Sequence, residues 1–172
     1  MTRNEIFEKV YSSYCTWYDM ERCGGEKTPL CATGAFHATD QAYMLVEKVQ
    51  MWTAHSNDYL YLYCMPELTL EQFDTLILEA KTAGEALIDP GKDHRSSYIT
   101  ALFICDTAEE AVVKKLCKYR FRKDFLFGFR GWEEIHTALI RSDNGSIRTN
   151  ADGRNTASFL NRILYPKKKG LF

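Results

Sequence analysis

Apolar side chains recur at helical spacing in several stretches of the chain, and three of these stretches begin with the same polar signal. Thr2, Thr69 and Thr107 are each followed three residues later by Glu or Gln. This is the capping-box pattern, in which the two side chains satisfy backbone N–H groups at the start of a helix. The predicted helices run from Thr2 to near Met20, from Thr69 to Pro90, onward from Thr107, and from Asn155 to Leu164.

Between these stretches the apolar period falls to two, which is the repeat of a β-strand. Residues 98–105 are apolar on both alternating faces, which indicates a central strand that is covered on both sides. An Asn-Gly pair at positions 144 and 145 indicates a hairpin turn. The predicted strands cover residues 31–36, 43–51, 59–64, 98–105, 121–129, 135–139 and 147–149.

The order of these elements is α-βββ-α-β-α-βββ-α. It predicts an α+β fold with a single sheet of about six to seven strands and helices packed on it. We expect mostly antiparallel pairing, with a mixed sheet as the alternative. No linker or low-complexity segment divides the chain, so residues 1–172 are expected to form a single globular domain.

The composition is that of a soluble globular protein, with 45% hydrophobic, 26% charged and 13% aromatic residues. So many aromatic residues exclude a disordered chain. No apolar run is long enough for a transmembrane helix, and no membrane partner is expected. The first residues lack the apolar segment of a signal peptide, so we expect a cytoplasmic location.

Six cysteines raise the question of disulfides or a metal site. Without an export signal, we expect their thiols to be reduced. Cys23, Cys31 and His37 come nearest to a set of metal ligands, but the chain has no Cys-x-x-Cys pair. We therefore predict neither a metal site nor a cofactor.

Charge is distributed unequally along the chain. Residues 1–110 hold 8 Lys and Arg against 18 Asp and Glu, a net of −10, and residues 111–172 hold 14 against 5, a net of +9. The two add to the formal net charge of −1. Such asymmetry marks either a surface that faces nucleic acid or another anion, or acidic and basic surfaces that pair. The pairing can lie within one chain or between copies, as in a homo-oligomer.

A run of basic residues without an acid covers positions 111–123. Such cations can bind nucleic acid by releasing the counterions condensed on its backbone. The alternative is a solvated helix face whose bases favour the negative end of the helix dipole. Because the whole chain is near neutral, we expect pairing with acids and do not favour nucleic acid. The candidate anion-binding residues are Lys114, Lys115, Lys118, Arg120, Arg122 and Lys123.

Phe125, Phe127 and Phe129 alternate along the segment that follows. An aromatic stripe on one face of a strand is usually core, so we predict that these three rings are buried. RNA-recognition sheets stack bases on aromatic residues spaced in this way. Asp124 and Leu126, however, stand where that motif has small residues.

A pocket is a further candidate beside Gly131, because glycine in a strand lets a ligand or another backbone come close. Arg130 and Trp132 would form its rim. In the preceding loop, Asp93 and His94 offer a base oriented by a carboxylate. The alternatives are a β-bulge and an ordinary polar loop.

The first six elements, α-βββ-α-β, are similar in order to those of the restriction-endonuclease-like nucleases. Those enzymes hold a metal ion with an Asp and a Glu, and have a Lys two residues after the Glu. The candidate acids here are Asp40, Glu47 and Asp58, and Val49 stands where that Lys is required. The favoured hypothesis is therefore a non-catalytic binding or interaction module. A nucleic-acid-associated protein or a degenerate nuclease is the alternative.

Overall fold

The structure is a computed structural model, and it describes residues 1–24, 28–38, 56–91 and 94–166. The α-helices are α1 (Arg3–Tyr14), α2 (Leu70–Glu85), α3 (Glu110–Lys118) and α4 (Arg154–Leu164), and η1 (Leu126–Gly128) is a short 3-10 turn. The strands are β1 (Asp19–Arg22), β2 (Leu30–His37), β3 (Ser56–Leu68), β4 (Ser96–Ala108), β5 (Arg122–Asp124), β6 (Trp132–Arg141) and β7 (Ile147–Thr149).

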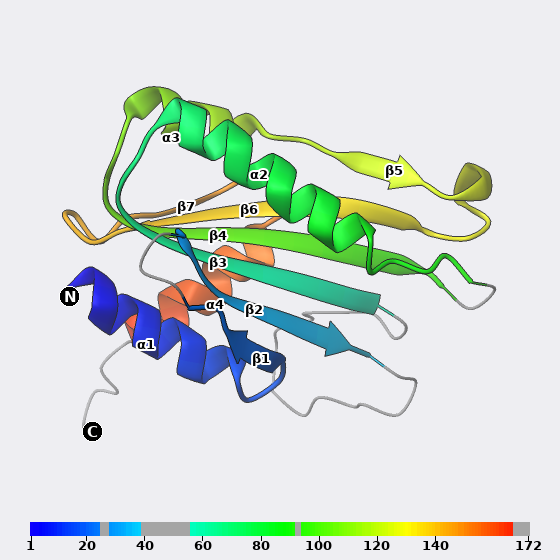
Figure 1. Cartoon of the computed structure of the whole chain (residues 1–172), viewed down its shortest axis with the longest axis horizontal. Coiled ribbons are helices and arrows are strands. Elements are labelled where there is room, and N and C mark those ends of the chain that lie inside the picture. Colours follow the sequence, from blue (N-terminus) through cyan, green and yellow to red (C-terminus); the bar gives the residue numbers. More distant parts are fainter. Residues whose placement is uncertain (25–27, 39–55, 92–93, 167–172) are drawn as a thin grey trace, which may run out of the picture.

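All seven of these strands belong to one sheet (Figure 1), in the order β1-β2-β3-β4-β6-β5, with β7 also paired to β6. The central strands β3, β4 and β6 run parallel. The outer pairs, β1 with β2, β2 with β3, β5 with β6 and β6 with β7, are antiparallel. The predicted α+β class is thus confirmed, and the sheet is mixed. Its parallel pairs follow from α2 and α3, because a parallel neighbour needs a crossover connection.

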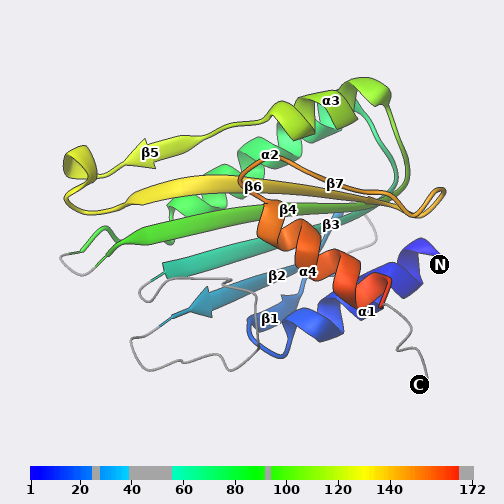
Figure 2. The same ribbon diagram turned by 180° about the vertical axis from the view of Figure 1, so that it is seen from behind.

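Helices cover both faces of the sheet. Figure 1 looks onto the face under α2 and α3, and Figure 2 onto the face under α1 and α4. Alternate residues of β4 belong to the two cores. Phe103 lies in one core with Phe73 of α2, and Leu102 lies in the other with Leu160 of α4; all four are fully buried. Each such side chain contributes roughly 1.5–3 kcal/mol relative to an exposed one.

Two of the three predicted capping boxes are present. The Thr2 and Thr69 side chains accept from the backbone N–H groups of Glu5 and Gln72 at 3.2 and 3.3 Å, and each box is reciprocated. The third prediction was wrong, because β4 continues through Thr107 in register with β3. Helix α3 therefore starts after Glu109, whose side chain does not cap this helix.

The first helix ends at Tyr14, not near Met20 as predicted. Residues 19–22 form the edge strand β1, in which Met20 pairs with Gly34 of β2. A Cβ at Gly34 would lie 2.3 Å from the Met20 sulfur, so a larger residue there would require the flexible Met20 side chain to move. Trp17, placed on the predicted helical stripe, is exposed.

The predicted hairpin at Asn144-Gly145 is present between β6 and β7, with Gly145 at φ 67° and the Asn144 side chain accepting from the Ser146 N–H. The predicted strand at 43–51 lies outside the described residues. Along the residues that are described, no helix has the length and apolarity needed to cross a membrane.

Candidate functional site

The connection between β5 and β6 carries an exposed apolar tip. Leu126, Phe127 and Phe129, named here the aromatic tip, expose 61%, 97% and 89% of their surface. The tip projects past the end of the sheet in both views of the fold (Figures 1 and 2). Contiguous exposed apolar side chains of this size are uncommon on a monomer and mark contact surfaces.

The prediction that Phe125, Phe127 and Phe129 are core residues was wrong: Phe127 and Phe129 are exposed, and Phe125 is only half-buried and belongs to neither core. Strand β5 ends at Asp124, and the chain then turns, so the period of two no longer sets which way a side chain points. Phe125 alone is partly buried. Gly128 and Gly131, which both have positive φ, mark this turn in the sequence. The sequence pattern alone is equally typical of a bulged strand end.

The backbone of the tip is strained. Leu126 and Phe127 lie at φ 47° and 55°, in the left-handed region, and Gly128 follows at φ 88°. A non-glycine residue there costs of order 1–3 kcal/mol and persists only where its surroundings fix it. The Phe125 carbonyl fixes this turn, because it accepts from the N–H groups of Gly128 and Arg130 at 3.0 and 3.1 Å.

The turn is anchored to the loop before β4. Gly131 lies at φ 76°, and a Cβ there would lie 2.0 Å from the Arg95 carbonyl oxygen. That same oxygen accepts from the Trp132 N–H at 3.1 Å. The two backbones are therefore in direct contact, as expected where glycine allows close approach.

Of the four predicted pocket residues, the structure brings three together at this base. His94 donates from Nδ1 to the Arg130 carbonyl oxygen at 2.6 Å, and its ring meets Phe125 edge-on at 5.5 Å. The Arg130 guanidinium donates to a backbone carbonyl at 3.3 Å. These contacts hold the tip in place. Asp93 lies outside the described residues.

The predicted basic residues are spread over α3, β5 and the segment between them. Four of the six lie within 4.0 Å of a carboxylate, in the pairs Lys115–Asp74, Arg120–Asp152, Arg122–Glu134 and Lys123–Glu133. Lys114 and Lys118 are exposed on α3, and no carboxylate of the described chain lies within that distance of them. Exposed pairs such as Lys115–Asp74 contribute little stability, whereas the Glu133 carboxylate of the Lys123 pair is buried.

A buried carboxylate lies on the face of the sheet under α1 and α4. Asp58, at the start of β3, is 2% exposed, and its two oxygens accept from Tyr18 Oη at 2.7 Å and Thr100 Oγ1 at 3.0 Å. Burial raises the pKa of Asp58, although the two hydroxyls and nearby His136 oppose that rise. Sequence analysis had considered Asp58 only as a metal ligand.

The network continues along the same face of the sheet towards β5. His136 stacks on Tyr98 with centroids 4.9 Å apart, and its Nε2 lies 3.8 Å from Glu134 Oε2. Hydrogen bonds with His136 and Arg122 lower the pKa of Glu134. Both oxygens of Asp58 accept protein hydroxyls, as in a structural buried carboxylate.

Two glutamates meet on the opposite face, between the end of α2 and the start of β6. Lys123 Nζ lies 3.6 Å from Glu85 Oε1 and 3.4 Å from Glu133 Oε1. Burial and a hydrogen bond with Glu85 raise the pKa of Glu133. For Glu85, burial is outweighed by Glu133, Lys81 and Lys123, which lower its pKa. Of the two carboxyl groups, Glu133 is the more deeply buried, which favours its neutral form.

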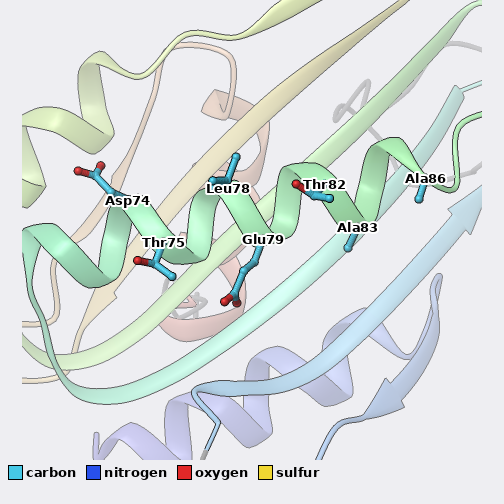
Figure 3. A pocket seen from close by; sticks show the side chains of 7 residues that line it. All are labelled: Asp74, Thr75, Leu78, Glu79, Thr82, Ala83 and Ala86. Atoms are coloured by element: carbon cyan, nitrogen blue, oxygen red, sulfur yellow. The ribbon is translucent and has the colours of Figure 1, made fainter.

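A shallow hollow of about 800 Å³ runs along the outer surface of α2, and Figure 3 shows the side chains that line it. All come from this one helix: Asp74, Thr75, Leu78, Glu79, Thr82, Ala83 and Ala86. Leu78 is 61% exposed. Leu78 lies off the buried stripe of this helix, so its exposure could have been inferred from the helical period. The buried stripe includes Phe73, Leu76, Ile77 and Ala80.

Metal ligands do not gather in the described part of the chain, where no group of three or more His, Cys, Asp or Glu could hold an ion. All six cysteines are free thiols. Two of the acids considered for a nuclease centre, Asp40 and Glu47, lie outside the described residues. Asp58, the third, is buried among hydroxyls.

Comparison with known proteins identifies a family but no activity. A family model described as "Domain of unknown function (DUF8052)" matches residues 2–162, and the chain belongs to this family. Neither the curated proteins nor the solved structures yield a match.

Proposed function

We propose that this DUF8052 domain is a non-catalytic interaction module that contacts a protein partner with its aromatic tip. The observation that carries the proposal is the exposure of Phe127 and Phe129, at 97% and 89%, on a backbone that is strained and anchored. Aromatic side chains supply much of the energy of protein interfaces when a partner covers them. A rigid presentation lowers the ordering cost of binding.

The anchoring supports this proposal over a loop that happens to be exposed. Gly131 packs against the Arg95 carbonyl group, and His94 bonds the Arg130 carbonyl oxygen. The turn is therefore fixed at its base while its apolar side chains face solvent. Such a combination suits a preformed contact element.

Association with nucleic acid has less support. Lys115, Arg120, Arg122 and Lys123 lie close to carboxylates, which reduces the positive potential they offer to phosphates. If nucleic acid is nevertheless the partner, heparin or short DNA will bind at about 50 mM salt, where such contacts are least screened. Replacing Lys114, Lys115 and Lys118 by Glu will then abolish the binding.

Photo-cross-linking in cells that naturally produce the chain tests the proposal. A benzoylphenylalanine at position 127 is expected to form adducts of discrete mass. The matched control carries the same group at position 17, where Trp17 is also exposed but lies in the connection between α1 and β1. Adducts at 127 that vanish when Leu126 and Phe129 become Ser support a contact role. Equal, weak labelling at 127 and 17 would contradict it.

A further inference from the structure

We infer that the aromatic tip of one copy of this chain binds the hollow on α2 of a second copy, giving head-to-tail self-association. The inference rests on the proposed function, because it names the partner of the same tip. Its starting point is that one chain carries both an exposed apolar projection and an exposed apolar hollow.

The two features cannot satisfy each other within one molecule. The tip projects beyond the end of the sheet, whereas α2, which carries the hollow, lies over the sheet itself (Figure 1). Both belong to the described, anchored part of the fold. A projection and a hollow at different places on one surface form a heterologous contact, in which each copy uses its tip on one neighbour and its hollow on another.

The chemistry of the two surfaces matches. Leu78, Ala83 and Ala86 give the hollow an apolar floor, and no large side chain fills it beyond Leu78 itself. Phe127 and Phe129 would lose exposed surface on packing against it. Aromatic rings bury large areas, and this burial is the main source of the expected affinity.

The charges around the two surfaces are opposite. The hollow is bordered by Glu79 and by Asp74, whose charge is offset by its pair with Lys115, and exposed Glu71 lies one turn before it. The base of the tip carries Arg95, which is exposed, and Arg130. Complementary potentials of this kind favour the correct encounter.

The same charges argue against the simplest alternative, a symmetric pair of α2 helices. In such a pair Glu71 and Glu79 of one copy would approach the same acids of the other across a two-fold axis. Like charges in an interface cost free energy, so a basic partner surface is favoured over a second acidic one. The tip supplies that basic surface.

Sedimentation of the purified chain tests the inference, using concentrations up to about 1 mM because a small interface implies weak association. The wild-type chain is expected to show a mass that rises with concentration beyond a dimer, since heterologous contacts do not close after two copies. Phe127→Ser with Phe129→Ser, and separately Ala83→Arg, should each weaken association at least about tenfold. Ala83→Arg fills the hollow and adds a charge that repels Arg95 and Arg130.

Sedimentation of a mixture of the two variants is the decisive measurement. The tip variant keeps an intact hollow, and the hollow variant keeps an intact tip, so an equal mixture should form heterodimers although each alone is monomeric. Trp17→Ala removes exposed aromatic surface elsewhere and should leave association unchanged. The circular dichroism of all variants checks that they are folded.

The outcomes separate this inference from the proposed function. A wild-type chain that stays monomeric at about 1 mM overturns self-association, while adducts from position 127 to another protein would still support the interaction module. Association that survives in the tip variant, or a mixture that stays monomeric, also overturns the inference. Failure of the cross-linking at 127 together with a monomeric chain overturns both.

Discussion

Replacing Asp58 tests whether the buried network under α1 and α4 holds the ends of the strands together. Asp58→Ala leaves the hydroxyls of Tyr18 and Thr100 without their acceptor in a buried site. Each unsatisfied buried hydroxyl costs roughly 1–3 kcal/mol. Removing a carboxylate whose burial raises its own pKa returns part of that loss. The expected net destabilisation at pH 7 is about 3 kcal/mol.

Asp58→Asn is the matched control, because it keeps the shape and one carbonyl acceptor. Its expected cost at pH 7 is below about 1 kcal/mol, since the amide needs no charged form in the buried site. The measurement is urea unfolding followed by circular dichroism and fluorescence. A cost for Asp58→Ala below about 1 kcal/mol would mean that water or neighbouring groups satisfy the hydroxyls, and would refute the reasoning.

The pH dependence gives a second check on Asp58. Its pKa is higher in the folded chain than in the unfolded one. A carboxyl group of this kind contributes stability below its unfolded pKa, about 3.9, and loses that contribution as pH rises through its folded pKa. The wild-type chain should therefore gain stability relative to Asp58→Asn as pH falls from 7 to about 4. An unchanged difference would show that Asp58 has the same pKa in both states.

Three further predictions follow from the exposure, geometry and charges of single residues. Phe127→Ala should change the free energy of unfolding by less than about 0.5 kcal/mol, whereas Phe103→Ala, which is fully buried, should cost about 3–5 kcal/mol in the same urea titration. Gly131→Ala should cost at least about 2 kcal/mol in thermal unfolding, because its Cβ meets a carbonyl oxygen, and Gly128→Ala, with open space around it, should cost only about 1 kcal/mol. Glu133→Gln keeps a donor to Glu85 and should be more stable than wild type at pH 8 but not at pH 4. The reason is that the raised pKa of Glu133 makes its contribution to the free energy of unfolding fade as pH rises. Equal dependence of stability on pH in the two chains would contradict this.

The parts of the fold that sequence patterns predicted are those set by local rules. The boxes at Thr2 and Thr69 and the turn at Asn144-Gly145 depend on a few neighbouring side chains, and all three are present. The box at Thr107 failed because a long-range interaction outweighed it: β4 stays paired with β3 through that residue. The parallel pairing of the centre of the sheet could not be derived, because strand order depends on contacts between distant segments.

The candidate site was less predictable, and the reason is geometric. The alternation of Phe125, Phe127 and Phe129 fits a strand until the backbone turns, and a turn at Leu126 and Phe127 requires φ values that these residues rarely adopt. Sequence rules place such turns at glycine or asparagine, so they pass over this one. The network around Asp58 joins residues 40 and 42 positions apart, which no local pattern could indicate.

The turn at Leu126 and Phe127 uses φ values that are rare for such residues, and this bears on the role of the aromatic tip. Glycine or asparagine at positions 126 and 127 would allow the same backbone with less strain and would remove two large apolar side chains from water. Neither Leu126 nor Phe127 packs into the cores on either face of the sheet. The fold therefore gains nothing from these side chains that a smaller polar pair would not supply. This absence of a role in the fold supports the proposal that a partner surface covers them.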